Sequence, residues 1–175
     1  MQTLGDVFAQ HADFYRERYV PFLLEEGFIT SVEESEYAEG IDGFKRLGAA
    51  EVEALPRDYQ TLLSEVGHGN IHFPTEGGPA RFSVLAPTEL AHWKQELPSF
   101  LAAAGSTLST DDAVPFLVDD GGGILAFLAG EEVFVVSHTG KLLGPAPSLL
   151  HFFSTMFENA REHRLPFEGV PQGPN

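Results

Sequence analysis

Hydrophobic positions recur at helical spacing in three parts of the chain. Between Leu55 and Val66, apolar residues fall at i, i+4, i+7, i+8 and i+11, which places them on one face of an α-helix. Pro56 suits the first turn of such a helix, and Gly67 follows the last apolar position, where a left-handed stop is easiest. The pattern predicts a helix over 55–66 that ends at Gly67.

Two further amphipathic helices are expected near the chain ends. Thr3 followed by Asp6 resembles a capping box, and the apolar spacing after it predicts a helix to about residue 19, which Pro21 should end or kink. Near the C-terminus, apolar residues recur at helical spacing over 149–160. Spacings of three or four also predict short helical pieces over 41–47 and 49–55, and a helix from Pro87 that Pro98 ends or restarts.

Short β-branched and aromatic runs dominate the second half of the chain. The runs VPFLV, ILAFL and VFVVS are separated by the turn clusters DDGGG and AGEE, which predicts a meander with a hairpin between the last two. The expected strands cover residues 70–73, 81–85, 114–118, 124–128, 133–137 and 141–144.

Helices first, then an antiparallel meander, then a closing helix is an α+β order. We expect a mostly antiparallel sheet of about four to six strands, covered by the helices over 55–66 and 149–160. Residues 1–40 are interpreted as an N-terminal helical extension and residues 41–163 as the α+β domain. Residues 164–175 are interpreted as a flexible tail, because the last ten contain three Pro and two Gly.

The composition narrows the class of protein. A chain of 175 residues can bury one ordinary core, and its 15 Phe predict a core rich in aromatic rings. The absence of Cys excludes disulfides and thiol catalysis. The N-terminal stretch has neither a continuous apolar run nor the pattern of a signal peptide, so a cytoplasmic protein is expected.

Charge gives the strongest functional signal. With 26 acids and 10 Lys plus Arg, the formal net charge is −16, which disfavours nucleic acid and anionic membrane and favours a basic partner. Two acidic groups contain no Lys or Arg, one over 25–42 and the other over 111–132. Solvated faces that keep the protein soluble are the alternative interpretation of both groups.

No reaction is indicated by the chemistry-bearing residues. His68 and His72 are the only closely spaced His pair, but Gly69 breaks the helix that would align them on a metal. The DDGGG cluster lacks the spaced ligands of a calcium loop and the Lys of a phosphate loop. Ser137 and His138 have no spaced acid for a triad. We therefore expect a binding module with no catalytic residue, metal or cofactor.

The order of motifs resembles the SUKH superfamily, which includes regulators of yeast cell-wall assembly. LPRDYQTLLSEVGHGNI, a helix with Trp93, DDAVPFLVDDGGGILAFLAGEEVFVVSHTG and PSLLHFFSTMF follow one another over about residues 41–160. The positions that carry the resemblance are Leu55, Pro56, Tyr59, Gly67, Gly69, Pro115, Phe116, Asp120, Gly121, Gly122 and the face Phe152–Phe157. The sequence Gly67-His68-Gly69-Asn70 and residues 1–40 depart from the family pattern.

The resemblance implies a bacterial immunity protein that neutralises a toxin by binding it. A toxin that acts on nucleic acid needs a basic surface, which an acidic protein would complement. A regulatory or scaffold module of the same fold, with an endogenous partner, is the alternative. The oligomeric state stays open. The candidate partner-binding residues are Glu33, Glu34, Glu36, His68, Asp119, Asp120, Glu131 and Glu132.

Overall fold

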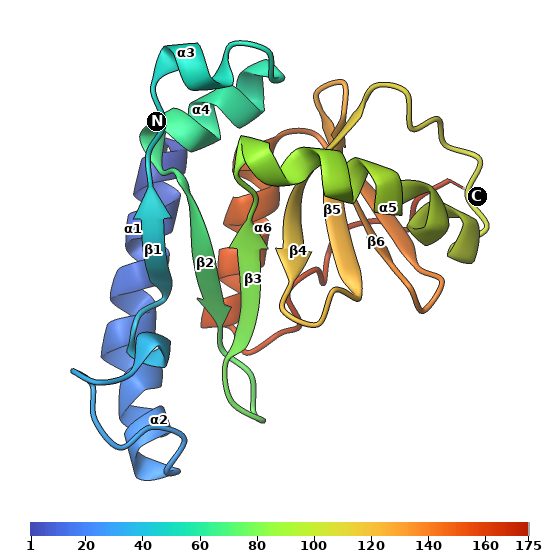
Figure 1. Ribbon diagram of the computed structural model, residues 1–175. Coiled ribbons are helices and arrows are strands. Elements are labelled where there is room, and N and C mark those ends of the chain that lie inside the picture. The colour runs from blue at the N-terminus through green and yellow to red at the C-terminus, as the bar shows by residue number, and fades with distance from the viewer. Residues whose placement is uncertain (175) are drawn as a thin grey trace.

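One antiparallel sheet organises the chain. The computed structural model describes residues 1–174, which form seven strands that lie in the sheet in chain order (Figure 1). The strands are β1 Ile41–Lys45, β2 His68–Phe73, β3 Ala80–Val84, β4 Ala113–Asp119, β5 Ile124–Ala129, β6 Glu132–Ser137 and β7 Leu142–Ala146. The predicted α+β class is confirmed, with seven strands where four to six were expected.

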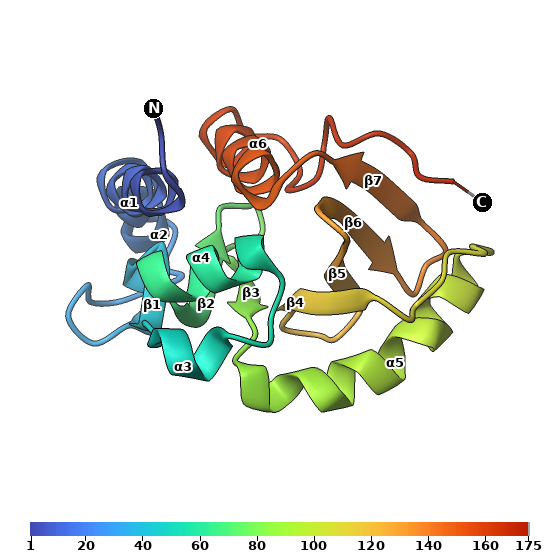
Figure 2. The ribbon, with the colours of Figure 1, turned by 90° about the horizontal axis from the view of Figure 1, so that it is seen from above.

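Helices cover both sides of this sheet. α1 and α6 lie side by side on one side, and α5 lies on the other against β4 (Figure 2). The helical elements are α1 Leu4–Phe14, the π-helical η1 Tyr15–Tyr19, α2 Val20–Glu25, the 3₁₀ turn η2 Glu36–Ala38, α3 Ala49–Val52, α4 Arg57–Glu65, the 3₁₀ turn η3 Pro87–Glu89, α5 Leu90–Ala103 and α6 Leu149–Arg161. None of the helices within residues 1–174 has the length and apolarity to cross a membrane.

The predicted helix boundaries depend on local chemistry that the structure confirms. The capping box at α1 is present, because the Asp6 N–H donates to Thr3 Oγ1 at 3.1 Å and the Thr3 N–H donates to Asp6 Oδ2 at 3.0 Å. α4 stops before Gly67, which has a φ of +109°. These ends are fixed by residues within one turn of each helix.

Proline has a weaker effect than the sequence predicted. Pro21 lies in the first turn of α2, directly after the π segment, where a missing N–H costs little. The helical path widens at Tyr15–Tyr19 and continues to Glu25. α5 runs through Pro98 as one helix, so the predicted break there is wrong.

β1 is a strand where the sequence pattern predicted a helix. Ile41, Phe44 and Leu47 have the helical spacing of three, but the segment is a strand. The register slips between Asp42 and Lys45 around Gly43, whose φ is +66°, so that one extra residue bulges out of the strand. Because of the extra residue, the Phe44 side chain points toward the core as that of Ile41 does. The inward residues of this strand are therefore three positions apart, as they would be in a helix.

Phenylalanine rings fill the main core, as the composition predicted. Phe8 of α1 lies 4.9 Å from Phe153 and 5.0 Å from Phe157 between ring centroids. Because Phe8 belongs to the same buried cluster as the strands, α1 packs as part of the main core although it precedes residue 41. A second small buried cluster consists of Tyr15, Tyr19, Val20, Leu23, Ile29 and Ala38.

The segment after α6 returns to the sheet. The Phe167 ring lies 5.7 Å from those of both Phe82 and Phe152. The Gly144 N–H donates to the Pro171 carbonyl at 2.6 Å and the Gly173 N–H donates to the Leu142 carbonyl at 2.8 Å, so the chain lies along the outer edge of β7. The Pro and Gly content of this segment does not predict these contacts.

Candidate partner-binding surface

The acidic segment 33–39 is attached to the sheet through its backbone. The Tyr15 hydroxyl donates to the Tyr37 carbonyl at 2.6 Å, and Nδ1 of His72 lies 2.6 Å from the Glu39 carbonyl. The His72 backbone N–H also donates to the Gly40 carbonyl at 2.9 Å. Since Tyr15 and His72 are fully buried, these contacts hold the segment in one position and leave its carboxylates in solvent.

A pair of buried histidines supports this attachment. Nε2 of His11 lies 2.9 Å from the His72 carbonyl, and the His11 ring stacks on Phe157 at 4.2 Å. Each ring nitrogen that faces a carbonyl must carry the proton, because a carbonyl only accepts. The other two nitrogens, His11 Nδ1 and His72 Nε2, are buried and have no hydrogen-bond partner within residues 1–174. Burial lowers the pKa of His11 to about 4.

A glycine allows the acidic segment to approach the helix. A Cβ placed on Gly40 would lie 2.8 Å from Cβ of Tyr15, closer than two carbon atoms can pack. Ile29, which precedes the acidic segment, and Ala38, which lies within it, belong to the same small cluster as Tyr15 and Tyr19. The position of the carboxylates therefore depends on a hydrophobic cluster separate from the main core.

Arg81 connects the two acidic groups. Its guanidinium lies 3.4 Å from Glu36 Oε1 and 2.8 Å from Asp120 Oδ1. The hydrogen bond to Asp120 raises the pKa of Arg81 above its ordinary value, so the cation is permanent. Arg81 comes from β3, Glu36 from η2 and Asp120 from the β4–β5 turn. We use the name acidic surface for Glu33, Glu34, Glu36 and Asp120.

Two carboxylates of the acidic surface have no cation of their own. Glu33 and Glu34 are exposed and form no ion pair within the described part of the chain, residues 1–174. Glu36 and Asp120 share the single charge of Arg81. The acidic surface thus keeps an excess of negative charge next to a fixed backbone.

Asp119 has a structural role that separates it from Asp120. Its Oδ1 accepts the Gly123 N–H at 2.7 Å and the Ile124 N–H at 2.9 Å. An Asp side chain that accepts backbone N–H groups a few residues ahead is a common way to close a turn. We therefore assign Asp119 to the β4–β5 turn and remove it from the candidate contact residues.

The remaining predicted site residues lie elsewhere. Glu131 and Glu132 are at the β5–β6 turn, at the end of β5 opposite to Asp120, and a strand of this length separates the two turns by roughly 17 Å. His68 begins β2 at the end of the sheet opposite to Arg81, and it pairs with Lys45. The structure therefore brings together Glu36 and Asp120 but does not bring Glu131, Glu132 or His68 to them.

The residues that organise this region were not identified from the sequence. Arg81 is the only Lys or Arg between Arg57 and Lys94, but one base in a strand carries no recognisable signal. His72 was weighed as a metal ligand and interpreted instead as a strand histidine with ordinary hydrogen bonds, and the structure places it in β2 with its side chain in the core. Across residues 1–174, no group of three or more His, Asp or Glu side chains is placed to hold a metal ion.

Comparison of the chain with protein-family models, curated proteins and solved structures finds no match. The resemblance to the SUKH superfamily thus stays a prediction from the motifs, and the class that fold and site define is an α+β protein with an acidic surface at one end of its sheet.

Proposed function

We propose that this protein binds a basic protein through the acidic surface. The observation that carries the proposal is the Glu36–Arg81–Asp120 bridge, which holds two acidic groups far apart in the sequence at one place. Complementary charge increases the rate of association and excludes partners of the wrong sign. A net charge of −16 extends this attraction beyond the contact itself.

Preorganisation supports a binding role for this surface. Ordering a loop when a partner binds costs free energy, and that cost reduces affinity. Here the backbone of 37–40 is already hydrogen-bonded to Tyr15 and His72, so binding a partner costs little further conformational entropy in this segment. A surface that served only solubility would not need a backbone hydrogen-bonded to buried histidine and tyrosine side chains.

The resemblance to SUKH immunity proteins makes a toxin the preferred partner. In this proposal the protein acts in the cytoplasm, where it covers the basic substrate-binding surface of the toxin. The alternative is a regulatory or scaffold module with an endogenous basic partner. The acidic surface fits both, because it selects for charge and not for the origin of the partner.

Affinity capture from native cells distinguishes these two functions. We would immobilise the full chain, wash at low ionic strength, and elute with salt up to about 1 M, which shortens the Debye length to about 3 Å. A toxin domain in the eluate supports the immunity function, and a housekeeping protein with no toxin supports the alternative. An eluate without any basic protein would contradict both.

A further inference from the structure

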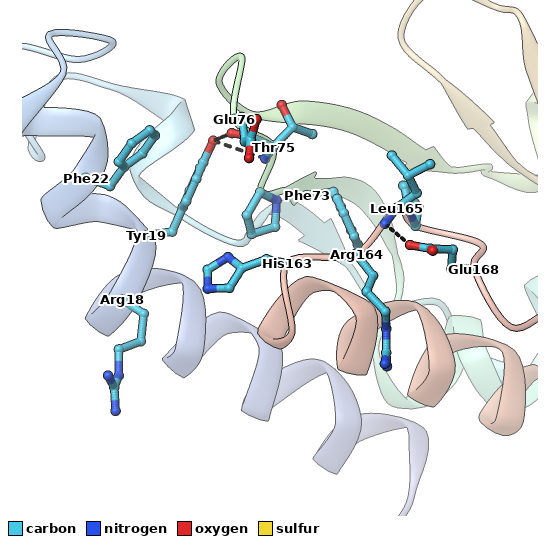
Figure 3. A pocket seen from close by; sticks show the side chains of 12 residues that line it. Arg18, Tyr19, Phe22, Phe73, Thr75, Glu76, His163, Arg164, Leu165 and Glu168 are labelled. Carbon is cyan, nitrogen blue, oxygen red and sulfur yellow. Dashed lines mark hydrogen bonds between the residues drawn. The ribbon is translucent and has the colours of Figure 1, made fainter.

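Three of the ten Lys and Arg residues of this acidic protein, Arg18, Arg161 and Arg164, line two joined hollows together with His163. One hollow of about 680 Å³ lies between η1, the β2–β3 turn and the chain after α6 (Figure 3). The other, of about 470 Å³, is lined by Phe14, Arg18, Arg161 and His163. Because Arg18 and His163 line both, the two form one groove, which we call the basic groove.

The two parts of the basic groove differ in chemistry. The larger part has a mainly apolar lining, formed by Tyr19, Phe22, Phe73, Pro74, Leu165 and Pro166, and Glu76 and Glu168 also line it. The smaller part is lined by three basic side chains and one phenyl ring, and no carboxylate of residues 1–174 lines it. A ligand that suits both parts is therefore mainly apolar at one end and anionic at the other, with the anionic end away from Glu76 and Glu168.

The cations of the smaller part are available to a ligand. Arg18 and Arg161 are exposed and form no ion pair within residues 1–174. Arg164, by contrast, is already bound to Glu162 at 2.8 Å and to Asn159 Oδ1 at 3.0 Å. In Figure 3 the His163 ring extends from the end of α6 into the space beside η1, between Arg18 and Tyr19.

His163 occupies a position at which glycine would cost less. It follows α6 with a φ of +59°, the left-handed conformation in which Schellman motifs usually place glycine. The motif is complete, since the Arg164 N–H donates to the Asn159 carbonyl at 2.8 Å and the His163 N–H donates to the Ala160 carbonyl at 3.4 Å. Non-glycine residues in the left-handed conformation cluster at functional sites, and His163 lines both parts of the basic groove.

The π segment provides a second, independent feature at the same place. η1 spans Tyr15–Tyr19 and carries Arg18 toward the basic groove while Tyr15 and Tyr19 stay buried. Single π turns inside helices occur frequently at functional sites. The Tyr19 hydroxyl also donates to the Thr75 carbonyl at 2.7 Å, which fixes one wall of the larger part (Figure 3).

We propose that the basic groove binds a small amphiphilic organic anion, with its carboxylate or sulfonate between Arg18, Arg161 and His163 and its aromatic or aliphatic body against Phe22 and Leu165, the accessible apolar side chains of the larger part. The volume of the larger part lies within the ordinary range for small-molecule sites, roughly 300 to 1,000 Å³. Hydrogen bonds from cations to an anion are about twice as strong as neutral ones, so the charged end supplies specificity. This inference does not depend on the function proposed for the acidic surface.

The test uses 2-naphthoate as the anionic probe and 2-naphthalenemethanol as its neutral match. We expect the carboxylate to bind the full chain at least about tenfold more tightly than the alcohol, as measured by titration calorimetry, since one charge-assisted contact corresponds to about that factor. NMR shift changes should be confined to residues 18–22, 73–76 and 161–166. Equal affinities of the two probes, or shift changes elsewhere, would overturn the proposal.

Variants locate the charge dependence. Arg18→Gln with Arg161→Gln should weaken naphthoate binding at least about tenfold and leave binding of the alcohol unchanged. The matched control, Arg16→Gln with Arg46→Gln, removes the same charge outside the basic groove and should bind naphthoate as the wild type does. A control that weakens binding equally would show that net charge, not the groove, is responsible.

His163→Gly gives a readout that a purely structural residue would not. Glycine adopts the left-handed conformation without strain, so the variant should be more stable to heat than the wild type and yet bind naphthoate less tightly. Unchanged naphthoate affinity in this variant would contradict a role for His163 in the site.

Discussion

Asp119 and Asp120 are neighbours in the chain, but their carboxylates have different roles. Asp119 accepts two backbone N–H groups of its own turn, whereas Asp120 is exposed and contacts Arg81. A carboxylate that satisfies backbone donors leaves them unpaired when it is removed, and an exposed ion pair contributes little to stability. The sequence DD alone does not distinguish the two residues. The difference depends on the turn conformation, which brings the N–H groups of Gly123 and Ile124 to Asp119, and on β3, which brings Arg81 to Asp120.

The stability of the two alanine variants should differ accordingly. Asp119→Ala should lower the free energy of unfolding by about 1–3 kcal/mol. Asp120→Ala should lower it by less than about 1 kcal/mol. Urea denaturation of both variants measures the difference, and equal losses would contradict the separation of roles.

His11 is a buried base whose ionisation opposes folding. Desolvation lowers its pKa from 6.5 to about 4 in the folded protein, so the folded state holds the neutral ring and the unfolded state binds the proton more readily. The stability that depends on the neutral ring is complete above pH 6.5. It is lost progressively as the pH falls from 6.5 toward 4.

Replacement of His11 should remove part of the acid sensitivity. A pKa lowered from 6.5 to about 4 corresponds to a loss of about 3 kcal/mol between those pH values. His11→Gln keeps an N–H donor for the His72 carbonyl but does not titrate, so its free energy of unfolding should fall less steeply with acid. His151→Gln, at an exposed position on α6, is the control. Identical pH profiles for His11→Gln and the wild type would refute the assignment.

At the scale of elements, local signals predicted the helices better than the strands. The starts of α1 and α6 follow from the side-chain caps Thr3 and Ser148, and the end of α4 follows from Gly67. β1 was predicted as a helix because a bulge at Gly43 gives its inward residues a spacing of three. The edge contacts of residues 171–173 also escape prediction, because they depend on a β7 edge that lies nearly thirty residues earlier in the chain.

The close approach between η1 and the acidic segment depends on Gly40. Gly40→Ala would force a Cβ to within 2.8 Å of Tyr15 and should cost about 1–3 kcal/mol by overpacking. Gly121→Ala is a suitable control, because its nearest neighbour would lie at 3.9 Å. Urea denaturation measures both. Near-equal stabilities would show that the acidic segment does not depend on this contact.

The segment after α6 should contribute to the core through Phe167. Its ring contacts Phe82 and Phe152 at 5.7 Å, and the residue is half-buried, so Phe167→Ala should destabilise the protein by about 2 kcal/mol. Leu165, two residues earlier, is 70% exposed, and Leu165→Ala should change stability by less than about 0.5 kcal/mol. Thermal unfolding of the pair decides whether this segment is part of the folded domain.

For the whole molecule, charge was readable from the sequence, but its arrangement was not. Counting acids and bases indicated an acidic protein with two base-free groups, over 25–42 and 111–132. The structure places Glu36 and Asp120 beside Arg81 and places Glu131 and Glu132 at the distant β5–β6 turn. This separation follows from the strand lengths and from the direction of the meander. The basic groove is likewise invisible in the sequence, since Arg18 and Arg161 are brought together only by the packing of α1 and η1 beside α6.

The central claim is that the place of the carboxylates in the fold, and not only the net charge of the protein, makes the acidic surface a binding site. We would measure the affinity of the captured partner for two double variants. One carries Glu33→Lys and Glu34→Lys, and the other carries Glu131→Lys and Glu132→Lys. Both variants change the net charge equally, but at opposite ends of the sheet. The account predicts at least about tenfold weaker binding and a shallower salt dependence for the first pair, and nearly wild-type behaviour for the second. Equal effects of the two pairs, or no effect of the first, would contradict it.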